Sequence, residues 1–330
     1  MTSSTYALVS DRLVLCAMVV YVLAMLSLAV GSALTSRGRR RAAVADRLPS
    51  AVALTAARGA TVTVDRGLPE PDLHGSSPRS APGTTRLTAI GTSLLGLGLV
   101  LTVAGIVARG AAAGRVPWSN MYEFTVVGVA AFMAAYLVLV ARPRTRVLLA
   151  AGVWIAGAAG LFLGLALTVL YTPAAGLIPV LDSAWLVIHV AAAIVAGGLF
   201  TVGAVASVLH LVQLRRERRR GVGSASSRAE TLEQAAQTAY TIAFPIWTFA
   251  VIAGAIWAEN SWGRYWGWDP KETWAFITWV FYAAYLHAQA TAGWRGKKAS
   301  WLGLAGYLAF LFNFIGVNIW VGGLHSYAGV

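Results

Sequence analysis

The sequence contains almost no cysteine. Cys16 is the only cysteine in 330 residues, and it lies in an apolar run where we expect it to be buried. A single cysteine excludes a disulfide framework, a Cys-x-x-Cys redox pair and a thiolate metal site within this chain. If the protein takes part in thiol chemistry, a partner must therefore supply the thiols.

Charge is also scarce. Charged residues make up 12% of the chain and hydrophobic residues 58%, whereas a soluble domain has about a quarter of its residues charged. This composition predicts a polytopic integral membrane protein. A net charge of +13 would favour nucleic acid in a soluble protein. Here the basic residues form short blocks between apolar runs, which is typical of topology signals, so we expect no nucleic-acid partner.

Eight segments meet the requirement of about 20 mostly apolar residues for a membrane-spanning helix. They predict an all-α integral membrane protein with about eight transmembrane helices, at 13–34, 87–108, 121–141, 147–171, 185–213, 241–258, 274–293 and 300–321. No basic region precedes the first apolar run and no cleavage site follows it, so we expect a retained helix rather than a signal peptide.

The predicted helices divide the chain into three regions. Residues 1–36 hold the first helix, 37–86 form an Arg-, Pro- and Gly-rich cytoplasmic loop that we expect to be partly disordered, and 87–330 form the main membrane domain. Residues 228–240 have a helix-forming, moderately amphipathic composition. They predict a short interfacial helix on the cytoplasmic side.

Basic residues predict the orientation. Four blocks follow the first, third, fifth and seventh segments, at 37–41, 142–146, 215–220 and 295–298. If eight helices alternate, all four blocks lie on one side, and the positive-inside rule assigns that side to the cytoplasm. Both termini are then on the outer face.

One stretch of the chain is exceptionally rich in tryptophan. Residues 257–279 hold six of the thirteen tryptophans, at positions 257, 262, 266, 268, 274 and 279. Gly263, Gly267 and Pro270 interrupt any regular element there. Membrane proteins usually place a few tryptophans at the interface as anchors. This density, mixed with glycine and charge, instead indicates a binding platform for a flat aromatic molecule on the outer face.

Two histidines lie at the same depth as this stretch. His189 falls about one turn into the fifth segment from the outside, and His325 follows the eighth segment. Two neutral imidazoles on either side of a flat aromatic surface could supply both axial ligands of a haem iron. The alternative is that both are interfacial histidines satisfied by loop carbonyls.

The other membrane-level histidines differ from this pair. His287 lies within the seventh segment, where an imidazole is costly unless a neighbour partners it. It could ligate a second metal centre if a partner subunit supplied the other ligand. His210 lies close to the cytoplasmic arginine block, and we expect it to be an interfacial residue.

Charged residues also crowd the tryptophan-rich stretch. Arg264 and Lys271 are candidate partners for haem propionates, because cations pair with carboxylates. Asp269 precedes Pro270 and fits the N-cap of a helix that starts there. A structural role for Asp269 is therefore at least as well supported as a chemical one.

These residues together resemble a known family. Trp262-Gly-Arg-Tyr-Trp-Gly-Trp-Asp-Pro-Lys-Glu-Thr-Trp274 resembles the WWD motif of the haem-handling protein superfamily. Pro117-Trp-Ser-Asn-Met-Tyr-Glu, Ser183-Ala-Trp-Leu-Val-Ile-His189 and Gly323-Leu-His-Ser-Tyr extend the similarity from about residue 87 to the C-terminus. The chain is similar to the cytochrome c biogenesis proteins of System II, the CcsA/ResC type (called CcsB in some bacteria).

The resemblance implies a component of a membrane cytochrome c synthase, or haem lyase, in the bacterial plasma membrane. It implies that haem b is held at an external site by His189 and His325, beside the WWD loop 257–274. The site residues that it implies in this loop are Trp262, Arg264, Trp266, Trp268, Asp269, Lys271 and Trp274. It also implies that His287 is an intramembrane haem ligand whose mate comes from a ResB/CcsB-type partner subunit.

The implied reaction joins the haem vinyl groups to the two thiols of an apocytochrome c Cys-x-x-Cys-His motif through thioether bonds. It needs reduced iron and reduced thiols, which leaves room for a thiol-reducing protein as a further partner. The contribution of this chain would be to hold the two reactants at near-attack geometry.

Two other functions remain open from the sequence. A haem exporter or chaperone without ligation activity would need the same platform and outer histidines. A proton-coupled membrane transporter would need paired acids within the membrane, whereas the acids of this chain lie in loops or at the membrane boundary.

Overall fold

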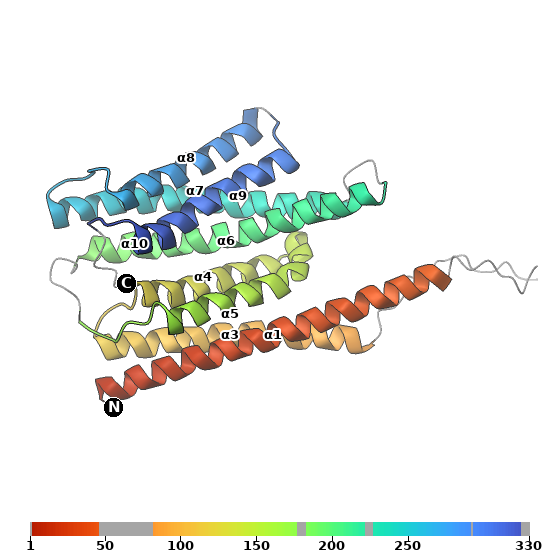
Figure 1. The fold of residues 1–330 in the computed structure, drawn as a ribbon, viewed down its shortest axis with the longest axis horizontal. Coiled ribbons are helices and arrows are strands. Elements are labelled where there is room, and N and C mark those ends of the chain that lie inside the picture. The colour runs from red at the N-terminus through yellow and green to blue at the C-terminus, as the bar shows by residue number, and fades with distance from the viewer. Residues whose placement is uncertain (1, 46–81, 177–182, 222–226, 292, 325–330) are drawn as a thin grey trace, which may run out of the picture.

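The computed structural model describes residues 2–45, 82–176, 183–221, 227–291 and 293–324, and these form an all-helical bundle (Figure 1). Its eight main helices are α1 (Ser3–Ala45), α3 (Pro82–Ala113), α4 (Met121–Ala141), α5 (Gly152–Thr168), α6 (Ala184–Arg219), α7 (Ser227–Trp262), α8 (Pro270–Thr291) and α9 (Lys297–Leu311). A 3-10 helix, η1 (Pro143–Ala151), leads into α5. A π-helical turn, η3 (Phe312–Gly316), joins α9 to the short α10 (Val317–Trp320).

Seven helical stretches within the described ranges are long and apolar enough to cross a membrane. They are Ser3–Gly38, Arg86–Ala113, Met121–Ala141, Thr145–Thr168, Ala184–Arg219, Arg228–Trp262 and Lys297–Trp320. The predicted span 274–293 corresponds to α8, a continuous helix of 22 residues. Its apolar run is interrupted by Trp, Tyr, His and Gln side chains. That α8 also crosses the membrane stays a prediction.

The structure corrects three expectations about the helices. Residues 228–240 are not a separate interfacial helix but the first half of the continuous α7, because nothing breaks the helix before Pro245 and Leu232 and Tyr240 are buried against the bundle. Helices α1 and α3 extend into the predicted loop 37–86 from both ends, and 46–81 lies outside the described residues. Cys16 is exposed on α1 rather than buried.

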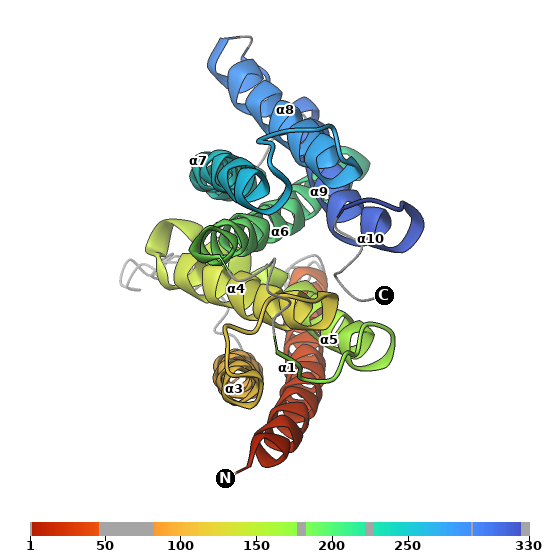
Figure 2. The same ribbon diagram turned by 90° about the vertical axis from the view of Figure 1, so that its left-hand side faces the viewer.

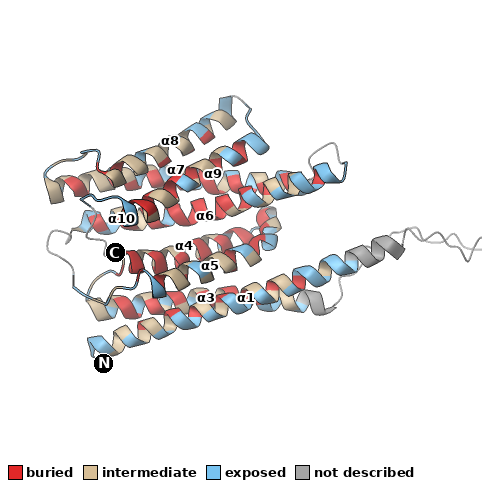
Figure 3. Cartoon of the chain, viewed as in Figure 1, coloured by how far each residue is buried: buried red, intermediate tan, exposed pale blue. Residues whose placement is uncertain are grey.

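Helix α6 lies at the centre of the bundle and packs against α4, α7 and α9, while α1 pairs with α3 and α5 along one side (Figure 2). Small residues permit the close contacts, as membrane helices require. A Cβ on Gly198 would lie 2.9 Å from the α4 backbone, and one on Gly203 would lie 2.4 Å from the Tyr240 ring of α7. The buried residues concentrate on α4, α6 and α7, whereas α1 and α3 are mostly exposed along their outer sides (Figure 3).

The two ends of the bundle differ in composition. The loop between α7 and α8, which holds most of the tryptophan-rich stretch, lies at the same end as the start of α1 and as α10 (Figure 1). The turns after α4, α6 and α8, which carry the basic blocks, lie at the opposite end. The basic turns therefore lie together at one end of the bundle and the tryptophan-rich loop lies at the other, as the sequence predicts.

Candidate functional site

A large, mostly apolar cavity opens at the tryptophan-rich end. It encloses about 1190 Å³ of space, open mouth included, and its walls come from the starts of α4, α6 and α8, the second half of α7, and η3. Its aromatic lining consists mainly of Trp247, Trp257, Trp262, Trp266, Phe310 and Phe314. A cavity of this kind, with few polar groups, is typical of a site for a flat apolar ligand.

His189 contributes an imidazole to the wall. Ser183 caps the start of α6, its hydroxyl accepting the Trp185 N–H at 3.3 Å, and His189 follows in the second turn. The His189 Nδ1 lies 2.7 Å from the carbonyl oxygen of Ala250 on α7. A carbonyl only accepts, so Nδ1 carries the hydrogen and the ring lone pair is on Nε2. This is the arrangement that orients a histidine as a metal ligand.

A glycine on the facing helix makes room for this imidazole. A Cβ on Gly254 would lie 2.6 Å from His189 Nδ1 and 2.7 Å from Cε1. The His189 ring also lies nearly parallel to the Trp257 ring, with centroids 6.3 Å apart and planes 9° apart. Sequence reasoning missed Gly254, and its only signal was an isolated glycine in an apolar helix.

Hydrogen bonds to two acidic side chains hold the loop before α8. Glu272 Oε2 accepts the backbone N–H groups of Gly267 at 2.8 Å and Asp269 at 3.1 Å. Asp269 Oδ2 accepts the N–H of Lys271 at 3.3 Å. These are the reciprocal contacts of a capping box, with Pro270 at the first helical position. Asp269 therefore starts α8 as the sequence predicts.

Asp269 also contacts the C-terminal segment. Its Oδ1 accepts the backbone N–H of Leu324 at 2.8 Å. A Cβ on Gly323 would lie 2.8 Å from that same oxygen and 3.3 Å from Pro270 Cδ. Residues 323–324 therefore pack tightly on the tryptophan-rich loop. His325 itself lies outside the described residues.

The tryptophans of the loop occupy different environments. Trp262 and Trp266 line the cavity. Trp274 packs on Phe312, with ring centroids 4.3 Å apart. Trp268 is 66% exposed and has φ +58°, a left-handed conformation that is costly for a bulky residue. The loop geometry therefore presents Trp268 outward instead of into the cavity.

The two predicted propionate partners, Lys271 and Arg264, lie in different places relative to the cavity. Lys271 lines the cavity, where burial lowers the pKa of its ammonium group to about 8 while the nearby Asp269 carboxylate opposes that shift. The Arg264 guanidinium instead lies over Gly267. It fills the space that a side chain at position 267 would occupy, because a Cβ on Gly267 would lie 0.7 Å from Arg264 Nη1. Arg264 does not line the cavity.

Two other histidines of the described residues, His210 and His287, do not line the cavity. His287 is exposed on the surface of α8. His210, which the sequence predicts to be interfacial, is 1% exposed, and its Nδ1 lies 2.7 Å from the Ser300 hydroxyl of α9. It follows His189 on α6 by 21 residues, or about 30 Å of helix, so it belongs to the basic end of the bundle.

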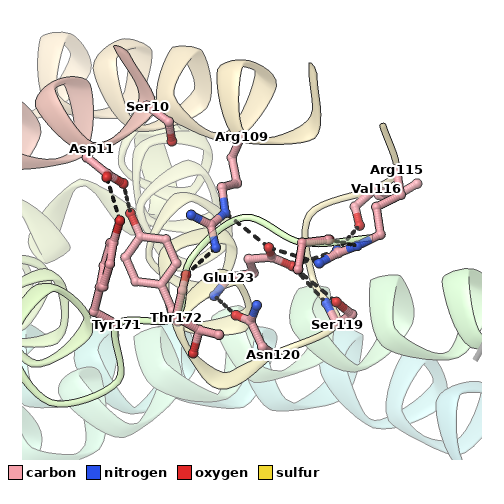
Figure 4. A network of polar contacts seen from close by, with 12 residues as sticks. Ser10, Asp11, Arg109, Arg115, Val116, Ser119, Asn120, Glu123, Tyr171 and Thr172 are labelled. Carbon is pink, nitrogen blue, oxygen red and sulfur yellow. Dashed lines mark hydrogen bonds and ion pairs between the residues drawn. The ribbon is translucent and has the colours of Figure 1, made fainter. Parts of the chain in front are cut away.

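A buried ionic network supports the wall beside the cavity (Figure 4). Glu123, at the start of α4, lies between Arg109 at 3.1 Å and Arg115 at 2.8 Å. Its Oε2 also accepts the Ser119 N–H at 3.1 Å, and Arg109 donates to the carbonyl of Thr172. The network joins the α3–α4 loop to the segment after α5, and sequence reasoning did not pair these residues.

The π-helical turn contributes an unexpected polar residue. Asn313 lies in η3, lines the cavity and is 9% exposed. Within the described part of the chain its Oδ1 is buried without a hydrogen-bond partner, and so is Glu272 Oε1. Single π-turns are frequent at functional sites, and both oxygens could accept from a molecule in the cavity.

The fold and site define a polytopic membrane protein with an aromatic, histidine-bearing cavity at one end. Residues 118–325, more than half of the chain, match the cytochrome C assembly protein family. The cytochrome c biogenesis protein CcsA of Porphyra purpurea is 31% identical over 283 residues, covering 74% of this chain and 88% of that protein. CcsA of Synechococcus sp. strain CC9902 is 34% identical, covering 75% and 88%.

The solved structure of the cytochrome c heme lyase CcmF has the same fold. The TM-score is 0.59 at 17% identity, over 99% of this chain and 51% of that one. The chain belongs to the cytochrome c assembly protein family and has a CcsA-type role in cytochrome c biogenesis.

Proposed function

We propose that this protein holds haem b in the aromatic cavity, with His189 and His325 as axial ligands, and presents it to apocytochrome c for thioether formation. The observation that carries the proposal is the setting of His189. Its Nδ1 is 2.7 Å from the Ala250 carbonyl, which leaves the lone pair on Nε2, and it stands on the wall of a tryptophan-lined cavity.

The chain's own residues have distinct tasks in this function. The rings of Trp257, Trp262 and Trp266 provide flat apolar walls, and the cavity excludes water from most of the porphyrin. Lys271 can pair with a propionate at the mouth while its ammonium group is charged. The Glu123 network holds the opposite wall in place.

The reaction is an addition without net loss of electrons. The sulfur of each apocytochrome thiol bonds to the vinyl carbon attached to the porphyrin ring, and the thiol hydrogen goes to the terminal vinyl carbon. Both thiols come from the apocytochrome, since Cys16, on the exposed face of α1, does not line the cavity. Its contribution is positioning, which can supply about 7–11 kcal/mol of a barrier, as a component of a membrane cytochrome c synthase.

The orientation and the partner are part of the same proposal. By the positive-inside rule the basic end of the bundle faces the cytoplasm, so the cavity and both termini face outward. His287 is exposed on α8. If α8 crosses the membrane as the sequence predicts, an unpartnered imidazole there is unfavourable. A ResB/CcsB-type subunit that covers α8 and supplies a second ligand would complete an intramembrane haem site on the way to the cavity.

The test is the visible spectrum of the full chain purified with its membrane partner, together with a ligation assay. We expect a low-spin bis-histidine spectrum that changes on His189→Gly or His325→Gly and returns with added imidazole. Covalent haem on an apocytochrome with Cys-x-x-Cys-His, but not with Ala-x-x-Ala-His, distinguishes ligation from haem export or chaperoning. Haem-free protein that matures cytochrome c normally with both histidines replaced would overturn the proposal.

A further inference from the structure

We infer that Glu272 transfers the thiol proton during thioether formation, in addition to the positioning that the cavity provides. This inference rests on the proposed function, because it assumes that haem and an apocytochrome thiol meet in the cavity. Glu272 lines the cavity from the first turn of α8, and Asn313 lines it from η3, which packs against α8. Each of the two residues is only 9% exposed.

The two carboxylate oxygens of Glu272 have different surroundings. Oε2 accepts the backbone N–H groups of Gly267 at 2.8 Å and Asp269 at 3.1 Å, and so holds the loop before α8. Within the described ranges, Oε1 is buried and has no hydrogen-bond partner. The structural role of Glu272 therefore uses one oxygen only. A buried acceptor without a partner needs an explanation, and on a cavity wall it indicates a donor that enters the cavity.

Haem b does not provide such a donor. Its pyrrole nitrogens bind iron, its vinyl groups have no polar hydrogen, and its propionates are ionised at neutral pH. The same holds for Asn313 Oδ1, which also lacks a partner among the described residues. The apocytochrome segment does have donors, in its backbone N–H groups and its two thiols. The two buried oxygens therefore fit the second reactant and not the first.

A carboxylate beside the reacting thiol can complete the addition. Glu272 Oε1 takes the proton as the S–H bond breaks, and the sulfur uses its electron pair to bond to the vinyl carbon attached to the porphyrin ring. The carboxylic acid then returns the proton to the terminal vinyl carbon, where the electron pair of the former double bond forms the C–H bond. Glu272 ends as a carboxylate, and no electrons are gained or lost. The amide of Asn313 can accept a hydrogen bond but cannot carry a proton in this way.

Glutamine separates the two roles of Glu272. Its carbonyl oxygen can replace Oε2 as the acceptor for Gly267 and Asp269, while its NH2 group takes the place of Oε1 and cannot accept a proton. Asn313→Leu removes the other unmatched oxygen at similar side-chain size. Glu259→Gln is the matched control, because Glu259 lies near the end of α7 and does not line the cavity.

The experiment uses the full chain purified with its membrane partner, loaded with reduced haem and mixed with a Cys-x-x-Cys-His peptide at several concentrations. The measurements are the visible spectrum, thermal unfolding and the rate of covalent haem attachment. We expect Glu272→Gln to keep the spectrum, the unfolding temperature and the half-saturating peptide concentration. Its rate at saturating peptide should fall about 10²- to 10⁴-fold, the usual contribution of a general acid–base group.

The two other variants should behave differently. Asn313→Leu should raise the half-saturating peptide concentration about 2- to 10-fold, the size of one hydrogen bond, and leave the rate at saturation nearly unchanged. Glu259→Gln should match the unchanged protein in every measurement. The contrast between a lost rate and a weaker peptide affinity distinguishes a proton carrier from a binding group.

The possible failures can be told apart. If the unchanged chain binds no haem or attaches none, the proposed function fails and the proton role fails with it. If the unchanged chain attaches haem and Glu272→Gln does so at the same rate, or is slower only through weaker peptide binding, the proton role is wrong and the proposed function stands. If Glu272→Gln does not fold, Glu272→Asp decides, because it keeps a carboxylate but withdraws it by one methylene. The proton role then requires a lower rate at saturating peptide with the spectrum unchanged, and an equal rate overturns it.

Discussion

His189 and His287 are the same residue type in two different settings within one bundle. The His189 ring is half-buried, is oriented by the Ala250 carbonyl at 2.7 Å, stacks beside Trp257 and faces a glycine. His287 stands exposed on α8, the helix that contacts α9 and α7 at the edge of the bundle (Figure 2). The first setting is built by contacts within this chain, whereas the second presents an imidazole on the surface of the bundle.

The difference separates a histidine held by contacts within this chain from one that is available to another surface. An imidazole at membrane depth without a protein neighbour is unfavourable, and under the proposed function a partner subunit covers this surface. The His189 setting predicts effects that are independent of the partner, whereas the His287 setting predicts effects that appear only with it.

The largest expected effect comes from replacing the two histidines one at a time. His189→Gly should abolish the low-spin haem signal of the cavity, because it removes a proposed iron ligand, while His287→Gly should leave that signal in place when haemin is added from outside. Visible spectra of the two variants, with and without imidazole, check this. Equal loss in both variants would contradict the view that the cavity site is separate.

The second effect is on stability. Glu123→Gln should lower the free energy of unfolding by about 3–5 kcal/mol, because it leaves the buried Arg109 without its counter-charge and removes the carboxylate from the half-buried Arg115. Thermal unfolding in detergent measures it, with Glu230→Gln, an exposed acid on α7, as the control. A small change would mean that the network does not anchor the wall beside His189.

The sequence allowed the broad plan to be predicted because long apolar runs, basic blocks and the tryptophan cluster are local signals. The start of α8 at Asp269 and Pro270 was predictable for the same reason. The contacts between helices were not. Nothing local pairs Glu123 with Arg109, sets Gly254 opposite His189 or connects Asp269 to Leu324, because each depends on how distant segments pack. Residues 228–240 were misjudged because packing of their apolar side chains continues α7.

A smaller effect should follow from filling the space opposite His189. Gly254→Ala places a methyl group 2.6 Å from Nδ1, so the ring must turn and its bond to Ala250 is lost. Haemin affinity of the cavity should fall about 10- to 100-fold, as when a supporting contact of a metal ligand is removed. Gly96→Ala on α3, with nothing within 4 Å, is the matched control. Unchanged affinity would show that the carbonyl does not orient His189.

The smallest effect is a pH dependence at the cavity mouth. The pKa of Lys271 is about 8 against an ordinary value of 10.5, so its ammonium group is charged below pH 8 in the empty protein. If it pairs with a propionate, haemin affinity should be full below pH 8 and should fall as the pH rises above it, by up to about fivefold, the size of a partly exposed ion pair.

The stability of the haem-free protein should move the other way, rising between pH 8 and 10.5, because over that range the unfolded chain binds more protons than the folded one. Lys271→Met should remove both slopes, whereas Arg264→Met, outside the cavity lining, should leave them. Haemin titrations and thermal unfolding at about pH 7, 8 and 9.5 make the comparison, and a slope that survives in Lys271→Met would assign the titration to another group.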